Sequence, residues 1–169
     1  MARANVKVRR NETAAKKRAA QSGQRTKARV KTPPRPRSKS RRKHAFIVNH
    51  VGEEAFKIDG LRRYARYRDL GVKDATHGMV VAHVIRFIPP CDPKEVSKEH
   101  YHDTEFQMIY VLKGWITSSF EDQGTHTMKA GDAWLQPPRI KHKVLDYSDD
   151  CEVLEIVMPA NFKTVELGS

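Results

Sequence analysis

The first 44 residues of this chain contain no Leu, Ile, Phe, Tyr or Trp, and this gap limits the part of the chain that can fold. They carry 17 Lys and Arg residues and one acidic residue, Glu12, whereas residues 45–169 carry 15 basic and 19 acidic residues. So little apolar surface cannot offset a backbone ordering cost of about 1–2 kcal/mol per residue. We therefore predict a disordered basic tail over residues 1–44 and one folded domain over residues 45–169.

The composition of the tail allows three interpretations. Its basic blocks attract phosphates, which fits an arm that binds nucleic acid without sequence preference. The tail has no aromatic side chain on which bases could stack, so base-specific recognition is not expected. A solvated tail without a dedicated partner is the simpler interpretation, and an Arg-rich organellar presequence is the third.

Membrane insertion and secretion are not indicated by the sequence. No run of 18 or more apolar residues occurs, so we expect no transmembrane helix and no membrane partner. Residues 1–20 lack the apolar segment of a signal peptide. Two cysteines, Cys91 and Cys151, are too few for a disulfide framework. We therefore expect a cytoplasmic protein.

Residues 45–169 consist of short apolar runs separated by turn-forming residues, a pattern that favours an all-β sandwich or barrel. Two of the runs, residues 106–112 and 153–158, are apolar on both faces, which indicates that a second copy of the chain covers one outer face in a homodimer. A helical turn fits only within residues 61–70. The expected strands cover residues 45–50, 79–88, 106–113, 115–120, 125–129, 133–135, 141–147 and 153–158.

The most specific local signal is His100-Tyr101-His102, followed by Gln107. Residues i and i+2 of a strand point to the same side, so the two imidazoles share one face at a separation suited to one metal ion. A third imidazole, His142, follows the rigid turn Pro137-Pro138. Two histidines at this spacing also arise by chance, so the residue types alone leave surface or core histidines as the alternative.

The wider pattern resembles the two motifs of the cupin superfamily. His100 and His102 are followed by four residues, Gln107, six residues and Gly114, in the spacing of the first motif. The second motif is matched by Gly131-Asp132, Pro137 and His142. The resemblance implies a cupin-type jelly-roll β-barrel that holds one divalent transition metal ion, Fe, Mn, Ni, Cu or Zn. The ligands that it implies are His100, His102, Gln107 and His142.

Gln107 departs from the motif, which usually has Glu at this position. A carboxylate supplies a negative charge, whereas an amide oxygen supplies only a dipole. A metal bound by three histidines and one amide would therefore acidify bound water more strongly and hold anionic substrates better. Glu105 shares strand parity with Gln107 and is the alternative ligand. It is also the candidate general base, although an exposed turn residue is its simpler role.

Several other residues have both a structural and a functional interpretation. His83 is more simply a core or pocket histidine than a further metal ligand. Trp134 could line the barrel opening or merely pack. The run of Arg62, Arg63, Arg66 and Arg68 around two tyrosines could steer an anionic ligand, but we favour an exposed edge or a dimer rim.

The sequence thus predicts a metal-binding cupin that acts on or binds a small polar molecule inside the barrel. If it is an enzyme, a dioxygenase or an isomerase is expected. The alternative is a ligand sensor without catalytic activity, whose tail binds nucleic acid non-specifically. The fold is compatible with both, because fold does not determine function.

Overall fold

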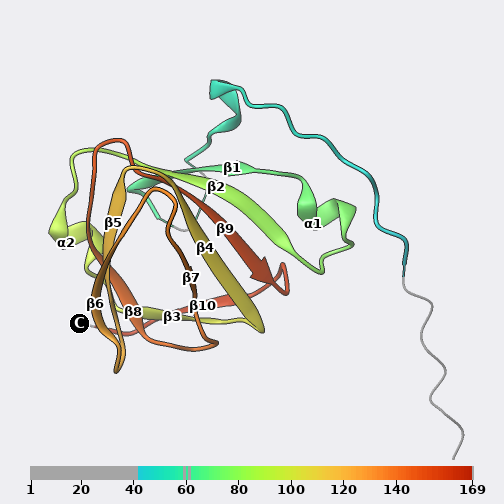
Figure 1. Cartoon of the computed structure of the whole chain (residues 1–169). Helices are drawn as coiled ribbons and strands as arrows, with labels where there is room; N and C mark the ends of the chain where they lie inside the picture. The colour runs from blue at the N-terminus through green and yellow to red at the C-terminus, as the bar shows by residue number, and fades with distance from the viewer. Residues whose placement is uncertain (1–41, 59, 61, 169) are drawn as a thin grey trace, which may run out of the picture. The chain divides into compact units, whose positions relative to one another are not determined.

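The structure is a computed structural model that describes residues 42–168 except Asp59 and Leu61, so the predicted disordered tail lies almost entirely outside the described residues. Within them, two five-stranded antiparallel sheets form a β-barrel (Figure 1), which confirms the all-β prediction. None of the helices in this described part has the length and apolarity needed to cross a membrane.

Each sheet combines strands that lie far apart in the sequence. The first sheet has the order β1 (Ala65–Asp69), β2 (Val81–Phe87), β9 (Glu152–Met158), β4 (Phe106–Lys113) and β7 (Ala133–Leu135). The second has the order β10 (Lys163–Glu166), β3 (His100–Asp103), β8 (His142–Tyr147), β5 (Trp115–Phe120) and β6 (Gly124–Lys129). Three helical turns connect them: η1 (Glu53–Ala55), α1 (Val72–Ala75) and α2 (Pro93–Val96).

Two sequence predictions of secondary structure are wrong. Residues 45–50 form no strand, because no neighbouring strand pairs with them. They make only isolated backbone contacts, such as the hydrogen bond that Ala45 N–H donates to Ala75 O at 3.0 Å. Residues 62–70 contain a hydrogen-bonded turn followed by a strand, and none of these described residues is helical. In this strand, β1, Ala65 pairs with Phe87 of β2, and Ala65 and Tyr67 both face the barrel interior.

The barrel core fills one end of the space between the sheets. Its buried members come from both sheets and include Val111 of β4, Ile116 of β5 and Val153 of β9. Burial of each such side chain contributes about 1.5–3 kcal/mol. The remaining interior, toward β3 and the start of β8, carries a group of polar side chains among apolar ones and encloses a cavity.

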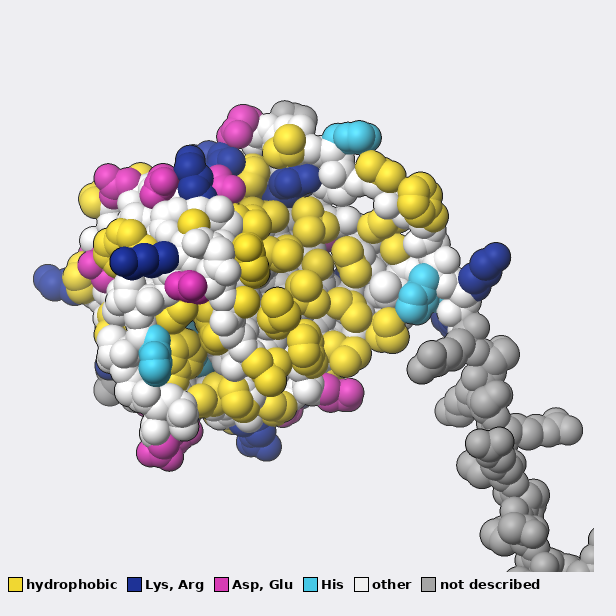
Figure 2. Space-filling model, in the orientation of Figure 1, with side chains coloured by type: hydrophobic (Ala, Val, Ile, Leu, Met, Phe, Trp, Pro, Cys, Tyr) yellow, Lys and Arg dark blue, Asp and Glu magenta, His cyan; other side chains and the backbone are white. Residues whose placement is uncertain are grey.

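The outer face of the first sheet is also apolar. Alternation along β4 places Gln107, Ile109 and Val111 inside and the intervening residues outside. Tyr110 and Leu112 of this outer face are 37% and 43% exposed. Figure 2 shows hydrophobic side chains gathered over the region where β2, β4 and β9 lie in Figure 1.

Candidate metal centre

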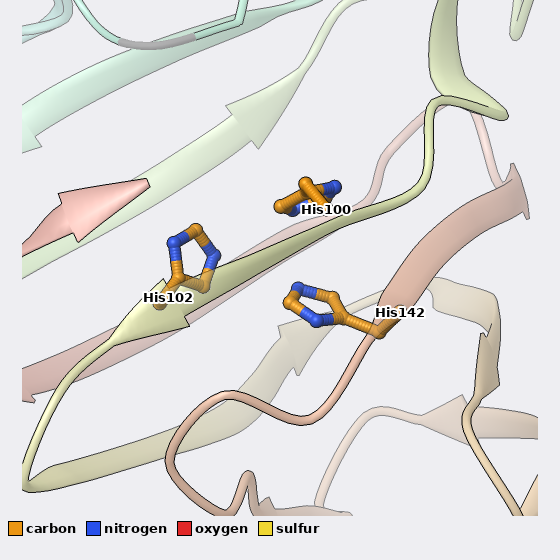
Figure 3. Close-up of side chains that lie close together, drawn as sticks. All are labelled: His100, His102 and His142. Atoms are coloured by element: carbon orange, nitrogen blue, oxygen red, sulfur yellow. The ribbon is translucent and has the colours of Figure 1, made fainter. Parts of the chain in front are cut away.

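Three buried histidines meet inside the barrel. His100 and His102 lie on β3 and point to one side, and His142, the first residue of β8, pairs directly with His100. One nitrogen of each ring lies within 4.8 Å of the others. Figure 3 shows the three rings facing a common space. The sequence predicted this grouping, and the structure brings the three side chains together.

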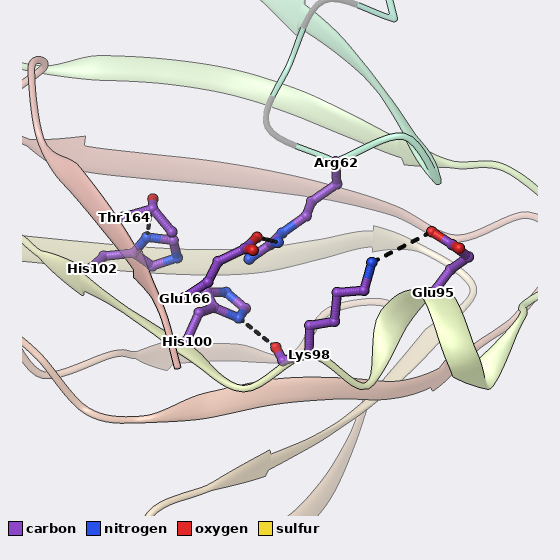
Figure 4. Close-up of polar contacts among 7 residues, drawn as sticks. All are labelled: Arg62, Glu95, Lys98, His100, His102, Thr164 and Glu166. Atoms are coloured by element: carbon purple, nitrogen blue, oxygen red, sulfur yellow. Dashed lines mark hydrogen bonds and ion pairs between the residues drawn. The ribbon is translucent and has the colours of Figure 1, made fainter. Parts of the chain in front are cut away.

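Hydrogen bonds on the outer side of the rings fix their orientation. His100 Nδ1 donates to Lys98 O at 2.8 Å, and His142 Nδ1 donates to Ile140 O at 2.9 Å. Because a carbonyl can only accept, each Nδ1 carries the proton and each Nε2 keeps its lone pair. His102 Nδ1 shares a 2.8 Å hydrogen bond with the hydroxyl of Thr164 on β10 (Figure 4). Partners of this kind orient metal-binding histidines in many proteins.

Burial keeps the three imidazoles neutral. It lowers the pKa of His100 to about 3 and that of His102 to about 4. The pKa of His142 is lowered by the same cause. Unprotonated nitrogens are what a metal ion requires, so near neutral pH all three rings are ready to bind one.

Gln107 faces the histidines from the opposite sheet. It is 2% exposed, and its Nε2 donates to Glu155 Oε1 at 2.6 Å. Its Oε1 accepts from Gln136 Nε2 at 2.9 Å, and the same Gln136 nitrogen lies 3.1 Å from His142 Nε2. Because the Glu155 carboxylate only accepts, the amide oxygen of Gln107 must point away from it, toward the histidine side.

Glu155 is the carboxylate of this cavity, and the sequence analysis did not find it. It lies on β9, and its Oε2 is 2.5 Å from His83 Nε2 on β2. Burial would raise the pKa of Glu155, but the hydrogen bond and charge of His83 outweigh it and hold the pKa below its ordinary value. The available signal was an acidic residue between Val153 and Val157, on the inward face of an apolar strand.

Glu105 takes a different place. It is exposed in the turn between β3 and β4, its N–H donates to Met158 O at 2.7 Å, and it is absent from the residues that line the cavity. Its assignment as a general base therefore remains a prediction of the sequence.

The cavity has a volume of about 340 Å³. His83 lines it as a pocket histidine, as expected, and Trp134 lines it as well. From the arginine run, Arg62 also reaches the cavity, whereas Arg63 and Arg66 are exposed. The expectation of an exposed rim thus fits only part of the run.

The donor set fits a divalent transition metal. Three imidazoles and one amide oxygen face the same cavity, and imidazole-rich sites suit Fe, Ni, Cu and Zn. Gln136 Nε2 already contacts Gln107 Oε1 and His142 Nε2. The hydrogen bonds of His100 and His102 among the described residues use only Nδ1, so a cation would give their Nε2 atoms a partner.

Comparison with known proteins decides the family. Residues 91–157 match the family model described as the cupin domain. Residues 91–157 form a cupin domain. The match contains His100, His102, Gln107 and His142, and it confirms the predicted cupin-type fold. No curated protein sequence matches the chain at a significant level.

Solved structures of other proteins share the fold at low sequence identity. KdgF from Halomonas sp. is 19% identical, with 68% of this chain and 94% of KdgF covered and a TM-score of 0.51. The polyketide cyclase RemF from Streptomyces resistomycificus is 19% identical, with 73% and 87% covered and a TM-score of 0.56. A sugar phosphate isomerase of the cupin superfamily from Silicibacter pomeroyi is 20% identical, with 66% and 71% covered and a TM-score of 0.50.

Proposed function

We propose that this cupin binds one divalent transition metal ion and acts on a small polar molecule in the adjoining cavity. The proposed ligands are Nε2 of His100, His102 and His142 and Oε1 of Gln107. The observation that carries the proposal is the group of three buried imidazoles whose ligand atoms lie within 4.8 Å of one another. A bound metal would supply Lewis acidity toward a polar group of the substrate.

The residues around the site favour isomerisation over oxygenation. Glu155 and His83 form a hydrogen-bonded pair that lines the same cavity, so a carboxylate and an imidazole are placed where a proton can be held and returned. Gln107 lies between this pair and the histidines, because its amide contacts Glu155 on one side and Gln136 on the other. The protein of similar fold from Silicibacter pomeroyi is a sugar phosphate isomerase, which is in keeping with this class of reaction.

Metal analysis of the full chain tests the proposal. We expect about one equivalent of metal in the unmodified protein and its loss in the double variant His100→Ala/His102→Ala. His126→Ala is the matched control, because His126 is exposed on β6 and bonds only Gln123 O among the described residues. Stoichiometric metal in the double variant would refute the site. Iron together with oxygen uptake would favour a dioxygenase over an isomerase.

We also propose that the protein forms a homodimer through the outer face of the first sheet. This face carries Met108 and Tyr110 of β4, paired with Ile156 and Leu154 of β9. An apolar sheet face can pack against its own copy about a twofold axis. Light scattering should give a dimer mass for the unmodified chain and a monomer mass for Tyr110→Asp. Thr125→Asp, exposed on β6, should remain dimeric.

A further inference from the structure

Arg62 reaches the cavity from the loop before β1. Its side chain is only 10% exposed, and it lines the same cavity as the three histidines. Figure 4 shows this side chain extending from its loop toward Glu166 and His100. Among the cavity-lining residues that the structure describes, Arg62 is the one permanent cation and Glu155 the one carboxylate.

The guanidinium of Arg62 is only half satisfied. Nη1 forms an ion pair of 2.5 Å with Glu166 Oε1, and the Glu166 side chain is 58% exposed. Nη2 is fully buried and has no hydrogen-bond partner among the described residues. Buried charged donors are rarely left without an acceptor, because the loss of their hydration is costly. An acceptor is therefore missing on the Nη2 side.

The protein does not supply that acceptor from Glu155. One oxygen of this carboxylate is bonded to His83 and the other to Gln107, and neither contacts Nη2 of Arg62, which has no hydrogen-bond partner among the described residues. A metal held by neutral imidazoles would add further positive charge to the cavity. An anionic guest would therefore be electrostatically favoured. An arginine nitrogen with two free N–H groups suits a carboxylate, since charged hydrogen bonds of this kind are short and strong.

The remaining walls describe the other part of the guest. They are mostly apolar and include aromatic side chains of the first sheet and of the loops. The apolar residues that could contact a ring are Tyr64, Ile85, Phe87, Ile109, Val153 and Phe162. A molecule that fills this space needs an apolar body with one anionic end.

We propose that Arg62 binds the carboxylate of a small organic acid whose apolar body fills the cavity. This inference rests on the proposed function in one respect, namely that the acid is the molecule on which the metal site acts. It assigns the substrate class and gives Arg62 a binding role.

Calorimetric titration of the full-length, zinc-loaded chain with benzoate tests this assignment near neutral pH. Benzamide is the neutral probe of the same shape, and phenyl phosphate is the competing anion. We expect benzoate to bind at least about 10-fold more tightly than benzamide, and Arg62→Gln to weaken benzoate about 10- to 100-fold while benzamide is unchanged. The control Arg63→Gln replaces an exposed arginine that does not line the cavity, and it should bind as the unmodified chain does.

A second variant covers the case in which Arg62→Gln does not fold. Glu166→Gln removes the exposed competitor for the guanidinium, so benzoate should bind about two- to fivefold more tightly, with benzamide unchanged. The inference is overturned if Arg62→Gln and Arg63→Gln bind benzoate equally, if benzoate has no advantage over benzamide, if neither binds, or if phenyl phosphate is preferred.

Metal content measured on the same samples separates this inference from the proposed function. Benzoate binding that depends on Arg62 in a chain that takes up no zinc would refute the metal site alone. Stoichiometric zinc without any effect of Arg62→Gln would refute the role of Arg62 alone.

Discussion

Gln107 occupies the position at which the first cupin motif usually has Glu, and its neighbours account for the amide. The carboxylate of this barrel is Glu155, one hydrogen bond farther from the histidines. A glutamate at position 107 would therefore face a second carboxylate. The carboxylate of the site thus lies on β9 rather than on β4, where the motif usually has it.

Exchanging the two side chains tests this relation. Gln107→Glu replaces a 2.6 Å hydrogen bond by two adjacent carboxylates, so the unfolding free energy of the metal-free protein should fall by about 1–3 kcal/mol. The double variant Gln107→Glu/Glu155→Gln restores an amide–carboxylate pair and should recover most of the loss. Urea denaturation measures both, and equal stabilities of the single and double variants would contradict the direct contact.

The buried histidines predict how the metal-free protein responds to acid. Burial lowers the pKa of His100 from 6.5 to about 3 and that of His102 from 6.5 to about 4. Between the folded pKa of each histidine and 6.5, the unfolded chain binds a proton that the folded chain does not bind. The free energy of unfolding is therefore highest above about pH 6.5 and falls as the pH is lowered. Each histidine should contribute a slope of up to about 1.4 kcal/mol per pH unit.

Denaturation at several pH values in the presence of a chelator measures this slope. The double variant His100→Asn/His102→Asn should show a clearly flatter dependence, since its side chains do not titrate there. The variant His126→Asn, at an exposed position on β6, should keep the slope of the unmodified protein. A profile without any decline below pH 6.5 would show that the rings are not buried as neutral groups.

At the scale of single residues, the sequence predicted what the motif spacing carries. The grouping of His100, His102 and His142 followed from strand parity and a rigid turn. Glu155 did not follow, and Arg62 was only one of four arginines for which an exposed rim was favoured, because the role of both depends on which segments become neighbours. The contact of Glu155 with His83 joins residues on β9 and β2 that are adjacent only in the folded sheet.

The hairpin between β4 and β5 shows why one motif residue must be glycine. Gly114 has φ +66°, and a Cβ at this position would clash with Ser148 Oγ. This oxygen accepts a hydrogen bond from Trp115 N–H at 2.9 Å. Gly124 also has a positive φ, +80°, but open space surrounds its Cβ position. Comparison of the two positions therefore distinguishes the cost of backbone strain from the cost of a steric clash.

Alanine at each position should show the difference. Gly124→Ala carries only the cost of the left-handed conformation, about 1–2 kcal/mol. Gly114→Ala adds the displacement of Ser148 and should lose about 1–3 kcal/mol more. Chemical denaturation measures both losses. Equal losses would show that Ser148 moves aside freely.

At the scale of elements, the apolar runs predicted most strands, and the failures have one cause. Alternation identifies a segment able to form a strand, but hydrogen-bond partners decide whether it does. Residues 45–50 begin with four apolar residues and find no ladder, as the 92% exposed side chain of Phe46 shows. Lys163–Glu166 has a weak apolar pattern, yet it forms β10 because β3 offers it an open edge.

At the scale of the whole molecule, the division of charge predicts two separable activities. Residues 1–44 carry 17 basic residues against one acidic residue, whereas the acidic residues of 45–169 outnumber the basic ones by 19 to 15. A second function, ligand sensing near nucleic acid, would use the tail. The barrel would not assist this binding, because acidic residues outnumber basic ones in it. Phosphate binding by counterion release depends steeply on salt.

Fluorescence anisotropy with labelled duplex DNA tests the role of the tail. If the tail contacts about six phosphates, the logarithm of the binding constant should fall against the logarithm of salt concentration with a slope near −5. A chain that lacks residues 1–44 should lose this binding yet keep its metal and its affinity for benzoate, because the sites for both lie within β-strands and loops after residue 60. A flat salt response, or equal DNA binding after the deletion, would leave the basic residues as a solvated tail. Retained DNA binding that vanishes with His100→Ala/His102→Ala would instead move the nucleic-acid site into the barrel, against the sign of its charge.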